Sequence, residues 1–443
     1  MTNTNLHNNY IGERHSYAYH SRDLLKFSIP MTLTAASAII TGIIDSIMAG
    51  HLGVSHLAGI ALATSVYFMF VIVGRGMSQG LSPIIARTIA KSNIEESQKL
   101  FSHSLLIQIW LGLVLTPILY LISNRLEIFG QEAEIATHAS SYLNVMCFFI
   151  LPQYIMQVLR TGIEAQGNSK FPMISSYTTA FLNIFLNWVF IFGNLGAPRL
   201  ELIGAALASG ISNSLLILVF YFYLKNRYHL YAFTGIKNGV DLRVVKQLLK
   251  IGGMFSFQWF IEVGAFSGST VILGIYSKTH LAAHQIVLNV ATLAFMIPLG
   301  LGAASTIKLS GAIERYGKKH TKPIVKSYLF TCWVATVLTS LAILITRNIV
   351  PSFYTNESEV LDLATSLLIF AAVFQFADGT QAVVSGVLRG YLDIKIPTII
   401  ITCAWWLLTL PLGYYLTITA QLGAYGMWYA LSFGLFLAAI LLT

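Results

Sequence analysis

The sequence of 443 residues has very little charge, since only 10% of its residues are Asp, Glu, Lys or Arg and 18 residues are acidic. Soluble domains average roughly a quarter charged residues, so these side chains are too few to cover a water-soluble globule. Three cysteines exclude a disulfide-based scaffold, and 34 scattered glycines exclude a collagen-like repeat. A hydrophobic content of 56% excludes intrinsic disorder. The composition therefore predicts a membrane protein.

Catalytic and nucleotide-binding motifs are also missing. The sequence contains no G-x-x-x-x-G-K-[ST] loop for ATP, no H-E-x-x-H zinc motif and no C-x-x-C pair. The stretch from Gly76 to Gly80 fits the G-x-S-x-G pattern around Ser78. That motif requires a strand-to-helix turn, whereas this stretch lies at the end of a predicted membrane helix. We therefore expect neither an enzyme nor a bound cofactor.

Apolar runs long enough to cross roughly 30 Å of hydrocarbon as helices occur about twelve times. They are nearly continuously apolar and do not alternate with polar residues, which favours helices over an outer-membrane barrel. The predicted spans are 24–50, 57–82, 101–123, 137–161, 171–193, 202–224, 247–274, 281–305, 325–347, 362–387, 396–418 and 423–442. The predicted fold class is an all-α integral membrane protein.

Basic residues collect on one side of this arrangement. With both termini placed in the cytoplasm, 22 of the 27 Lys and Arg fall in or next to cytoplasmic loops and four fall outside. This asymmetry fixes the orientation of membrane proteins. It also explains the net charge of +9 without a nucleic-acid partner. The remaining basic residue, Arg75, lies within a span, and we interpret it as a snorkelling or loop-anchoring arginine.

The two halves of the sequence resemble each other at an offset of 224 to 225 positions. At this offset, Leu24-Leu25-Lys26 lies on Leu248-Leu249-Lys250, and His56-Leu57-Ala58 lies on His280-Leu281-Ala282. Because each half has six spans, both cross the membrane in the same direction, which predicts two pseudo-symmetric lobes that rock about a central cleft. The expected segments are a cytoplasmic amino-terminal stretch (1–23), an N-lobe (24–224), a cytoplasmic linker (225–246) and a C-lobe (247–443).

Three acidic residues, Asp45, Glu262 and Asp378, fall inside the predicted spans. A carboxylate at the centre of a membrane helix costs about 3 kcal/mol, so three such groups require compensation. Burial favours the neutral carboxyl, whereas a bound cation favours the ionised form, so these groups are suited to exchanging H⁺ or Na⁺. The alternative is a permanently protonated acid that forms hydrogen bonds between helices.

Depth in the membrane separates the three acids. At ~1.5 Å per residue from the outer ends of the spans, Asp45 lies roughly 9 Å deep, Glu262 roughly 18 Å and Asp378 roughly 24 Å. The repeat aligns none of the acids with another acid, and Asp45 aligns with Ser269. The two lobes therefore carry different acid sites, so that one can bind the ion while the other contributes to a substrate site.

Paired amide side chains lie four residues apart, and therefore on one helix face, in two of the spans. Asn183 and Asn187 form one such pair in the fifth span, and Gln285 and Asn289 form the other in the eighth. Amides inside a membrane can coordinate an ion, here beside Asp45, or form hydrogen bonds that hold helices together. Both interpretations stay open at this stage.

Four stretches together resemble the multidrug and toxic compound extrusion (MATE) transporters of the NorM-like subfamily, over about residue 22 to the end. They are Ile44-Asp45-Ser-Ile-Met-Ala-Gly-His-Leu-Gly53, Phe260-Ile-Glu262-Val-Gly264, Ala282-Ala-His-Gln-Ile286, and Ala377-Asp378 followed by Gly386-Val-Leu-Arg-Gly-Tyr391. The resemblance implies a second-lobe cation site, for Na⁺ or H⁺, at Glu262 and Asp378. It also implies a first-lobe cation or substrate site at Asp45, Asn183 and Asn187, and we expect Gln285 and Asn289 to contact the substrate.

By this resemblance, a V-shaped pair of six-helix bundles imports Na⁺ or H⁺ and expels organic cations and other amphipathic drugs, as a monomer in the bacterial cytoplasmic (inner) membrane. The alternative is a flippase for a lipid-linked precursor within the same superfamily. Such a flippase favours a cationic cleft, and three intramembrane acids against one arginine argue against it. The chain stops at Thr443, directly after the last span, where a basic tail is expected, which indicates an incomplete terminus.

Overall fold

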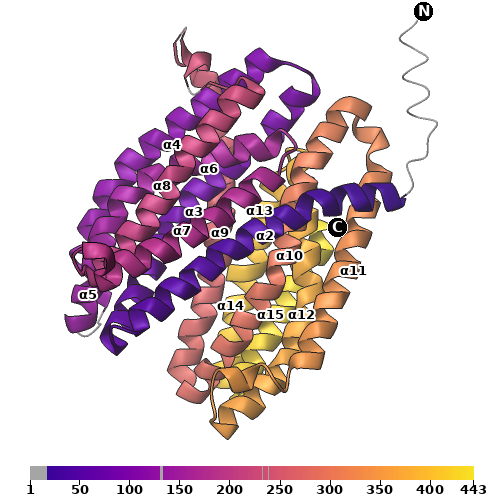
Figure 1. Cartoon of the computed structure of the whole chain (residues 1–443). Helices are drawn as coiled ribbons and strands as arrows, with labels where there is room; N and C mark the ends of the chain where they lie inside the picture. Colours follow the sequence, from indigo (N-terminus) through magenta and orange to yellow (C-terminus); the bar gives the residue numbers. More distant parts are fainter. Residues whose placement is uncertain (1–16, 130–132, 232, 238) are drawn as a thin grey trace, which may run out of the picture.

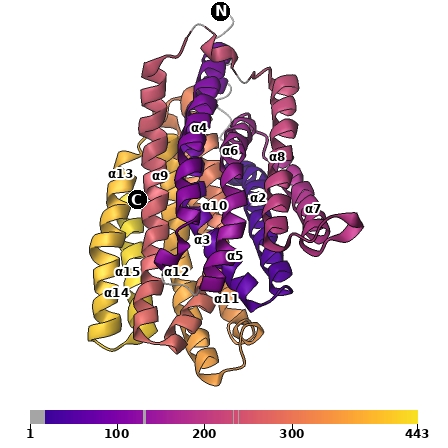
Figure 2. The same cartoon turned by 90° about the vertical axis from the view of Figure 1, so that its left-hand side faces the viewer.

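The computed structural model describes residues 17–129, 133–231, 233–237 and 239–443, and these residues form an all-helical protein (Figures 1 and 2). Within them, 12 helical spans are long and apolar enough to cross a membrane. The spans are α2 (Tyr17–Gly50), α3 (Val54–Ala90), α4 (Ile94–Ser123), α5 and α6 (Ala133–Met146 and Ile150–Ala165), α7 (Lys170–Phe192), α8 (Glu201–Tyr228), α9 (Leu242–Tyr276), α10 (Lys278–Tyr316), α11 (Lys322–Thr346), α12 (Ser358–Gly390), α13 and α14 (Lys395–Thr402 and Leu410–Tyr414, with π-helical turns at Cys403–Thr409 and Tyr415–Thr419), and α15 (Gly423–Leu442). The predicted fold class is confirmed.

The helices are longer than predicted on the side of the molecule where α2 begins and α3 ends, which we call the basic side. There α3 continues to Ala90, past the predicted 82, and α10 continues to Tyr316, past the predicted 305. These extensions carry charged residues such as Arg87 and Arg315, which continue a helix but lower its hydropathy. The amino-terminal stretch is affected too, because α2 already begins at Tyr17, while residues 1–16 lie outside the described residues.

Polar caps start two of the helices on the basic side. The Asn93 side chain accepts the backbone N–H of Glu96 at 3.0 Å, and its Nδ2 donates to the Glu96 carboxylate at 3.0 Å. Asp241 begins α9 by accepting the backbone N–H of Arg243 at 2.9 Å. These caps satisfy N–H groups that have no partner inside the helix. They explain why α4 and α9 start several residues before their apolar stretches.

The spans form two bundles of six, α2–α8 and α9–α15, with apolar clusters inside each bundle and a further cluster in which α2 packs against α10. Phe220 and Ile163 of the first bundle belong to one such cluster, and Trp405 and Trp428 of the second bundle to another. In Figure 1, α3–α8, in indigo to magenta, lie on one side, α10–α15, in orange and yellow, lie on the other, and α2 crosses between them. Large apolar side chains such as Phe181, 71% exposed, point outward from the bundles. Such a surface suits contact with lipid rather than water.

The two bundles contact each other from the middle of the helices to the basic side. Lys308 Nζ lies 2.9 Å from the Asp23 carboxylate, and Lys91 Nζ lies 3.3 Å from that of Glu314. Arg87 donates to the backbone oxygen of Gly390 at 2.7 Å. Among the described residues, no hydrogen bond or ion pair joins the bundles in the half opposite the basic side. The hydrogen bonds and ion pairs that join the bundles therefore lie in the half of the molecule that includes the basic side.

Small residues set the position of α12 against α10 within the second bundle. A Cβ at Gly386 would overlap the backbone of Gly302, and one at Gly302 would lie 2.6 Å from the backbone oxygen of Ala382. No side chain fits at either position without movement of the backbone. The close approach fixes the height and rotation of α12, which carries Asp378.

Candidate cation and substrate sites

Asp45, on α2, lies at the centre of a buried hydrogen-bond network in the first bundle. Its Oδ1 accepts the Asn187 amide from α7 at 2.6 Å, and its Oδ2 accepts the Ser209 hydroxyl from α8 at 3.0 Å. Asn183 donates to Ser209 at 2.9 Å and accepts the Asn187 amide at 3.1 Å. The structure thus brings the predicted asparagine pair to Asp45. Among the described residues, no Lys or Arg forms an ion pair with this carboxylate.

A cavity of about 540 Å³ adjoins this network, and Asp45 lines it. Its other walls come from α2 and α3 and are mostly apolar, with Ile43 and Leu57 among them and the hydroxyls of Ser46 and Thr64 as polar exceptions. Two further residues at this site were not predicted from the sequence. Ser209 is an inconspicuous hydroxyl in an apolar span, and Tyr142 of α5, which lies within the electrostatic reach of Asp45, is buried among apolar residues. A mostly apolar cavity with one carboxylate suits an organic cation.

Glu262, on α9, lies at the second predicted site, in the other bundle. Its Oε1 accepts amide hydrogens from Gln258 at 3.2 Å and from Gln381 at 3.4 Å. The amide oxygens of both glutamines are buried without a hydrogen-bond partner among the described residues. The indole of Trp406 donates to the backbone oxygen of Ile261 at 3.1 Å, which holds this turn of α9 in place. Glu262 therefore lies beside two unused oxygen ligands.

Asp378, on α12, interacts electrostatically with Glu262 but contributes no hydrogen bond among the described residues. Its side chain is 8% exposed and lies near the thiol of Cys332 on α11. Glu262 lines a small cavity of about 30 Å³ together with Gln381 and Arg389, and Asp378 does not. The two predicted acids are therefore close enough to interact electrostatically, and of the two only Glu262 lines the small cavity.

Ser269, the residue of the second bundle that the sequence repeat aligns with Asp45, has a hydroxyl in place of the carboxylate. Ser269 contacts the buried imidazole of His284 at 3.4 Å, and Thr270 contacts the same nitrogen at 3.4 Å. Gln285 donates to Thr270 at 3.4 Å, whereas Asn289 is exposed. Neither of these amides lines a cavity described above. Their predicted contact with substrate stays a prediction.

The expectation that Arg75 is a snorkelling or loop-anchoring arginine is wrong, because its side chain faces the second bundle. Arg75 lies 15 residues before the end of α3 at Ala90, because the helix is longer than predicted. The Cζ atom of its guanidinium lies over the Trp259 ring of α9, 5.3 Å from the ring centre. Arg160 and Arg389, which were counted from the sequence among the residues in or next to cytoplasmic loops, belong to α6 and α12 and line the same cavity between the bundles. The contacts of these arginines lie within the protein, not in water.

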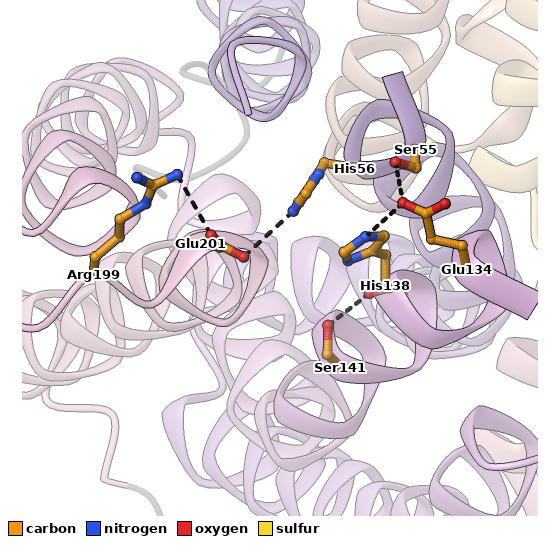
Figure 3. Close-up of polar contacts among 7 residues, drawn as sticks. All are labelled: Ser55, His56, Glu134, His138, Ser141, Arg199 and Glu201. Carbon is orange, nitrogen blue, oxygen red and sulfur yellow. Dashed lines mark hydrogen bonds and ion pairs between the residues drawn. The ribbon is translucent and has the colours of Figure 1, made fainter. Parts of the chain in front are cut away.

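A polar cluster joins α3, α5 and α8 at the side opposite the basic side (Figure 3). The rings of His56 and His138 stack with their centres 3.9 Å apart. His56 contacts Glu201 at 3.3 Å, and His138 contacts Glu134, which also accepts the Ser55 hydroxyl at 2.7 Å. The described residues contain no group of three or more His, Cys, Asp or Glu that could hold a metal ion. The contacts of the cluster join the ends of α3, α5 and α8.

The part of the chain that the structure describes has 12 helical spans long and apolar enough to cross a membrane, and its buried Asp45 and Asp378 carboxyls form no ion pair there. These features are typical of a multi-pass membrane transporter. The sequence profile of the MatE family matches residues 30–189 and 255–415, one match in each half of the chain. The chain therefore belongs to the MatE family, and the resemblance noted from the sequence is confirmed.

Curated relatives match nearly the whole chain. A "Probable multidrug resistance protein NorM" of Listeria innocua is 32% identical over 97% of this chain and 94% of its own length. A "Multidrug resistance protein NorM" of Vibrio vulnificus is 27% identical over 97% of this chain and 95% of its own. Among solved structures, the eukaryotic MATE transporter AtDTX14 superimposes with a TM-score of 0.86 at 20% identity, covering 96% of this chain and 95% of that one. This structural match supports the fold alone.

Proposed function

We propose that this protein is an antiporter that uses inward movement of Na⁺ or H⁺ to export organic cations and amphipathic drugs by alternating access. One observation carries the proposal. Asp45 and Glu262 each lie beside buried amide oxygens that have no hydrogen-bond partner among the described residues, and no Lys or Arg pairs with either carboxylate. Oxygen-rich sites with a negative charge are what a hard cation binds. The names of the curated relatives support the substrate class.

Charge competition is the mechanism that fits these residues. The ionised Asp45 carboxylate holds a cationic drug in the adjoining apolar cavity, and an entering Na⁺ or H⁺ neutralises a carboxylate and weakens that hold. Each monovalent cation that moves inward contributes about 2.3 kcal/mol per 100 mV, so one or two ions support roughly a tenfold to thousandfold drug gradient. Glu262 and Asp378 form the ion site in this scheme, and Asp45, Asn183 and Asn187 form the ion or drug site.

The proposed location is the bacterial cytoplasmic membrane, with the basic side in the cytoplasm, since loops rich in Lys and Arg stay inside. In this orientation the contacts between the bundles close the cytoplasmic side, which corresponds to an outward-facing state. A related structure, a multidrug resistance MATE family transporter of the MOP superfamily, has that conformation. We expect a monomer to suffice, because the proposed sites lie within one chain.

Glu262→Gln tests the coupling role of Glu262. The variant removes the charge and keeps the size, so export driven by an ion gradient should be abolished while the protein still inserts. Transport is measured in vesicles with a Na⁺ gradient and a pH gradient imposed separately, which also identifies the driving ion. Glu127→Gln, on an exposed segment, is the matched control. Undiminished transport by Glu262→Gln would refute the coupling role.

A flippase for a lipid-linked precursor is the second candidate, and one observation favours it. The cavity between the bundles is lined by three arginines, Arg75, Arg160 and Arg389. From the sequence, only Arg75 was expected within the membrane. A pyrophosphate head group binds such a cationic cavity. Expression in a drug-sensitive host separates the candidates, because an exporter raises tolerance to ethidium in a Na⁺- or pH-dependent way and a flippase does not.

A further inference from the structure

The polar cluster at the ends of α3, α5 and α8 has no role in the antiport scheme, and in the proposed orientation it faces the outside (Figure 3). The rings of His56 and His138 lie 3.9 Å apart. Each imidazole has a carboxylate beside it, Glu201 at 3.3 Å from His56 and Glu134 at 3.7 Å from His138. Arg199 lies 3.4 Å from the other oxygen of Glu201. Two side chains that exchange protons near neutral pH thus stand between acids on the outer face.

The imidazoles of this cluster lie deeper than its carboxylates. The side chains of Glu134 and Glu201 are 69% and 44% exposed, whereas those of His138 and His56 are 23% and 16% exposed. Nδ1 of His56 is buried and has no hydrogen-bond partner among the described residues. Leaving a buried polar atom unpaired costs free energy, so a histidine with a purely structural role is expected to use both nitrogens. The cluster therefore leads from acids in contact with water to imidazoles that reach inward.

Two of the same helices continue from the cluster to Asp45. On α5, Tyr142 lies one turn inward of His138, and residues four apart share a helix face. Tyr142 interacts with the Ser209 hydroxyl and with the charge of Asp45. Ser209 donates in turn to Oδ2 of Asp45 at 3.0 Å, and it lies roughly 12 Å further along α8 than Glu201. Groups with exchangeable protons therefore follow one another from the outer face to Asp45.

This line of groups reaches Asp45 from a different side than a drug does. The cavity beside Asp45 is lined by residues of α2 and α3, whereas Tyr142 and Ser209 belong to α5 and α8 and do not line it. A drug in the cavity covers one side of the carboxylate and leaves the side that faces Ser209 unchanged. Charge competition requires that a proton reach Asp45 while the drug is still bound. A separate approach for the proton meets this requirement.

We propose that this cluster collects protons from the outside and passes them to Asp45 through Tyr142 and Ser209, behind a bound drug. The inference rests on the proposed antiport and names H⁺ as the ion that reaches the first-bundle site. An outer carboxylate takes a proton from solution and gives it to its imidazole. A charge on His56 disfavours a second charge on the adjacent ring of His138, which drives a proton from His138 inward across one helical turn, a gap that one water bridges. The hydroxyls of Tyr142 and Ser209 each accept one proton and release another, so only Asp45 ends with an added proton.

Acid-triggered release of a bound fluorescent cation tests this relay. The purified full-length chain in detergent is loaded with ethidium at alkaline pH and mixed rapidly with acidic buffer, and the ethidium fluorescence is followed in time. His138→Ala should slow the release by about tenfold or more, since proton transfer by a positioned side chain contributes about a hundredfold or more. The final amount released should equal that of the wild type, because Asp45 and the cavity are unchanged. His51→Ala, at an exposed histidine directly after α2, should release ethidium at the wild-type rate.

Small molecules separate a proton relay from a structural role of the imidazole. 4-Methylimidazole exchanges protons near neutral pH and should restore the release rate of His138→Ala, whereas pyrazole has a similar shape, does not take up a proton in this range and should not. Restoration by both compounds would show that the ring only fills space and would overturn the proposal. If His138→Ala does not fold, Tyr142→Phe replaces it, because it keeps the ring, removes the exchangeable proton and should also slow the release. Release at the wild-type rate in the variant that folds would refute the relay.

The outcome for the wild-type chain separates this proposal from the proposed function. Release of ethidium by Na⁺ and not by acid would refute the relay and leave the antiport standing. Release by neither ion, or no binding of ethidium, would count against both.

Discussion

Asn187 on α7 donates its side-chain amide to Oδ1 of Asp45 on α2 across 2.6 Å. This bond joins two helices that are distant in the sequence and fixes which way the asparagine faces. Because its nitrogen is engaged by Asp45 and by Asn183, its own oxygen stays buried and without a hydrogen-bond partner among the described residues. Asp45 thus has neutral donors that stabilise its charge without cancelling it, so the charge stays available to a cation.

Replacing Asn187 by Leu should impair the first-bundle site. The substitution removes the amide hydrogen bond to the Asp45 carboxylate, so the ionised form becomes less favourable and binds a cation about tenfold more weakly. In transport assays the acid limb of the pH profile should therefore move to higher pH. Ser209→Ala removes the longer bond of 3.0 Å and should give a smaller shift in the same direction. An unchanged profile for both variants would exclude Asp45 from the transport cycle.

Replacing Asp378 by Asn should shift the pH profile of transport in the opposite direction. Asp378 acts on Glu262 as a like charge, so its removal lowers the attraction of the site for a cation. Protonation or Na⁺ binding at Glu262 should then require a lower pH or more Na⁺, and the acid limb should move to lower pH. Transport is measured in the same vesicles used for Glu262→Gln. A shift to higher pH would show that the two acids do not act as one site.

The start of α9 gives a prediction about stability and pH. A hydrogen bond from Lys99 at 2.7 Å lowers the pKa of Asp241 to about 2, with help from the backbone N–H of Arg243. A lowered pKa means that Asp241 stabilises the fold above the unfolded-state value of about 4 and loses this effect as the pH falls from about 4 to about 2. Asp241→Asn should therefore lower the thermal midpoint at pH 7, and the difference from wild type should shrink toward pH 3.

Asp362→Asn is the control for that measurement, because Asp362 is exposed and far from the start of α9 in the chain. Its midpoint should follow the wild type at both pH values. A constant deficit of Asp241→Asn at every pH would assign the effect to lost helix capping rather than to charge.

Two ion pairs hold the bundles together on the basic side, between Asp23 and Lys308 and between Lys91 and Glu314. Partly exposed pairs contribute about 0.2–1 kcal/mol each, so breaking both should shift the balance of conformations by up to about thirtyfold. The double variant Lys308→Gln and Glu314→Gln should populate the state that is open on the basic side. Spin labels at positions 125 and 352, one on each bundle and both exposed, report this change as a shorter distance distribution.

The spin-label experiment requires a background without Cys147, Cys332 and Cys403. An unaltered distance distribution in the double variant would show that apolar packing alone keeps the bundles closed. That packing involves Phe27 and Met31 of α2 against Leu301 of α10.

The fold was predictable because the membrane enforces long apolar helices, and the ends opposite the basic side fall within a few residues of the predicted ones. Several ends on the basic side, such as those of α3 and α10, were not predictable from hydropathy, since charged residues continue these helices into water. Arg160 and Arg389 lie at or just beyond the predicted ends of their spans and were counted with the cytoplasmic loops, so the arginine cavity was not predicted.

The acids stood out in the sequence because a carboxylate in an apolar run is rare. Their partners did not stand out equally. Asn187 has a recognisable spacing from Asn183, whereas Ser209 and Tyr142 look like ordinary residues of apolar helices until α5, α7 and α8 are placed around Asp45. Only a three-dimensional arrangement identifies such residues.

The unusual length of α10 has a mechanical consequence. α10 runs from Lys278 to Tyr316 over roughly 58 Å, and Pro298 lies near its middle, where it removes a backbone hydrogen bond and makes the helix easier to bend. A bend of about 10° at this point displaces the tip beyond it by roughly 5 Å. That travel exceeds the reach of the contact between Glu314, near one tip, and Lys91. A small change of angle in the middle of α10 is therefore enough to break the contact between Glu314 and Lys91 near its end.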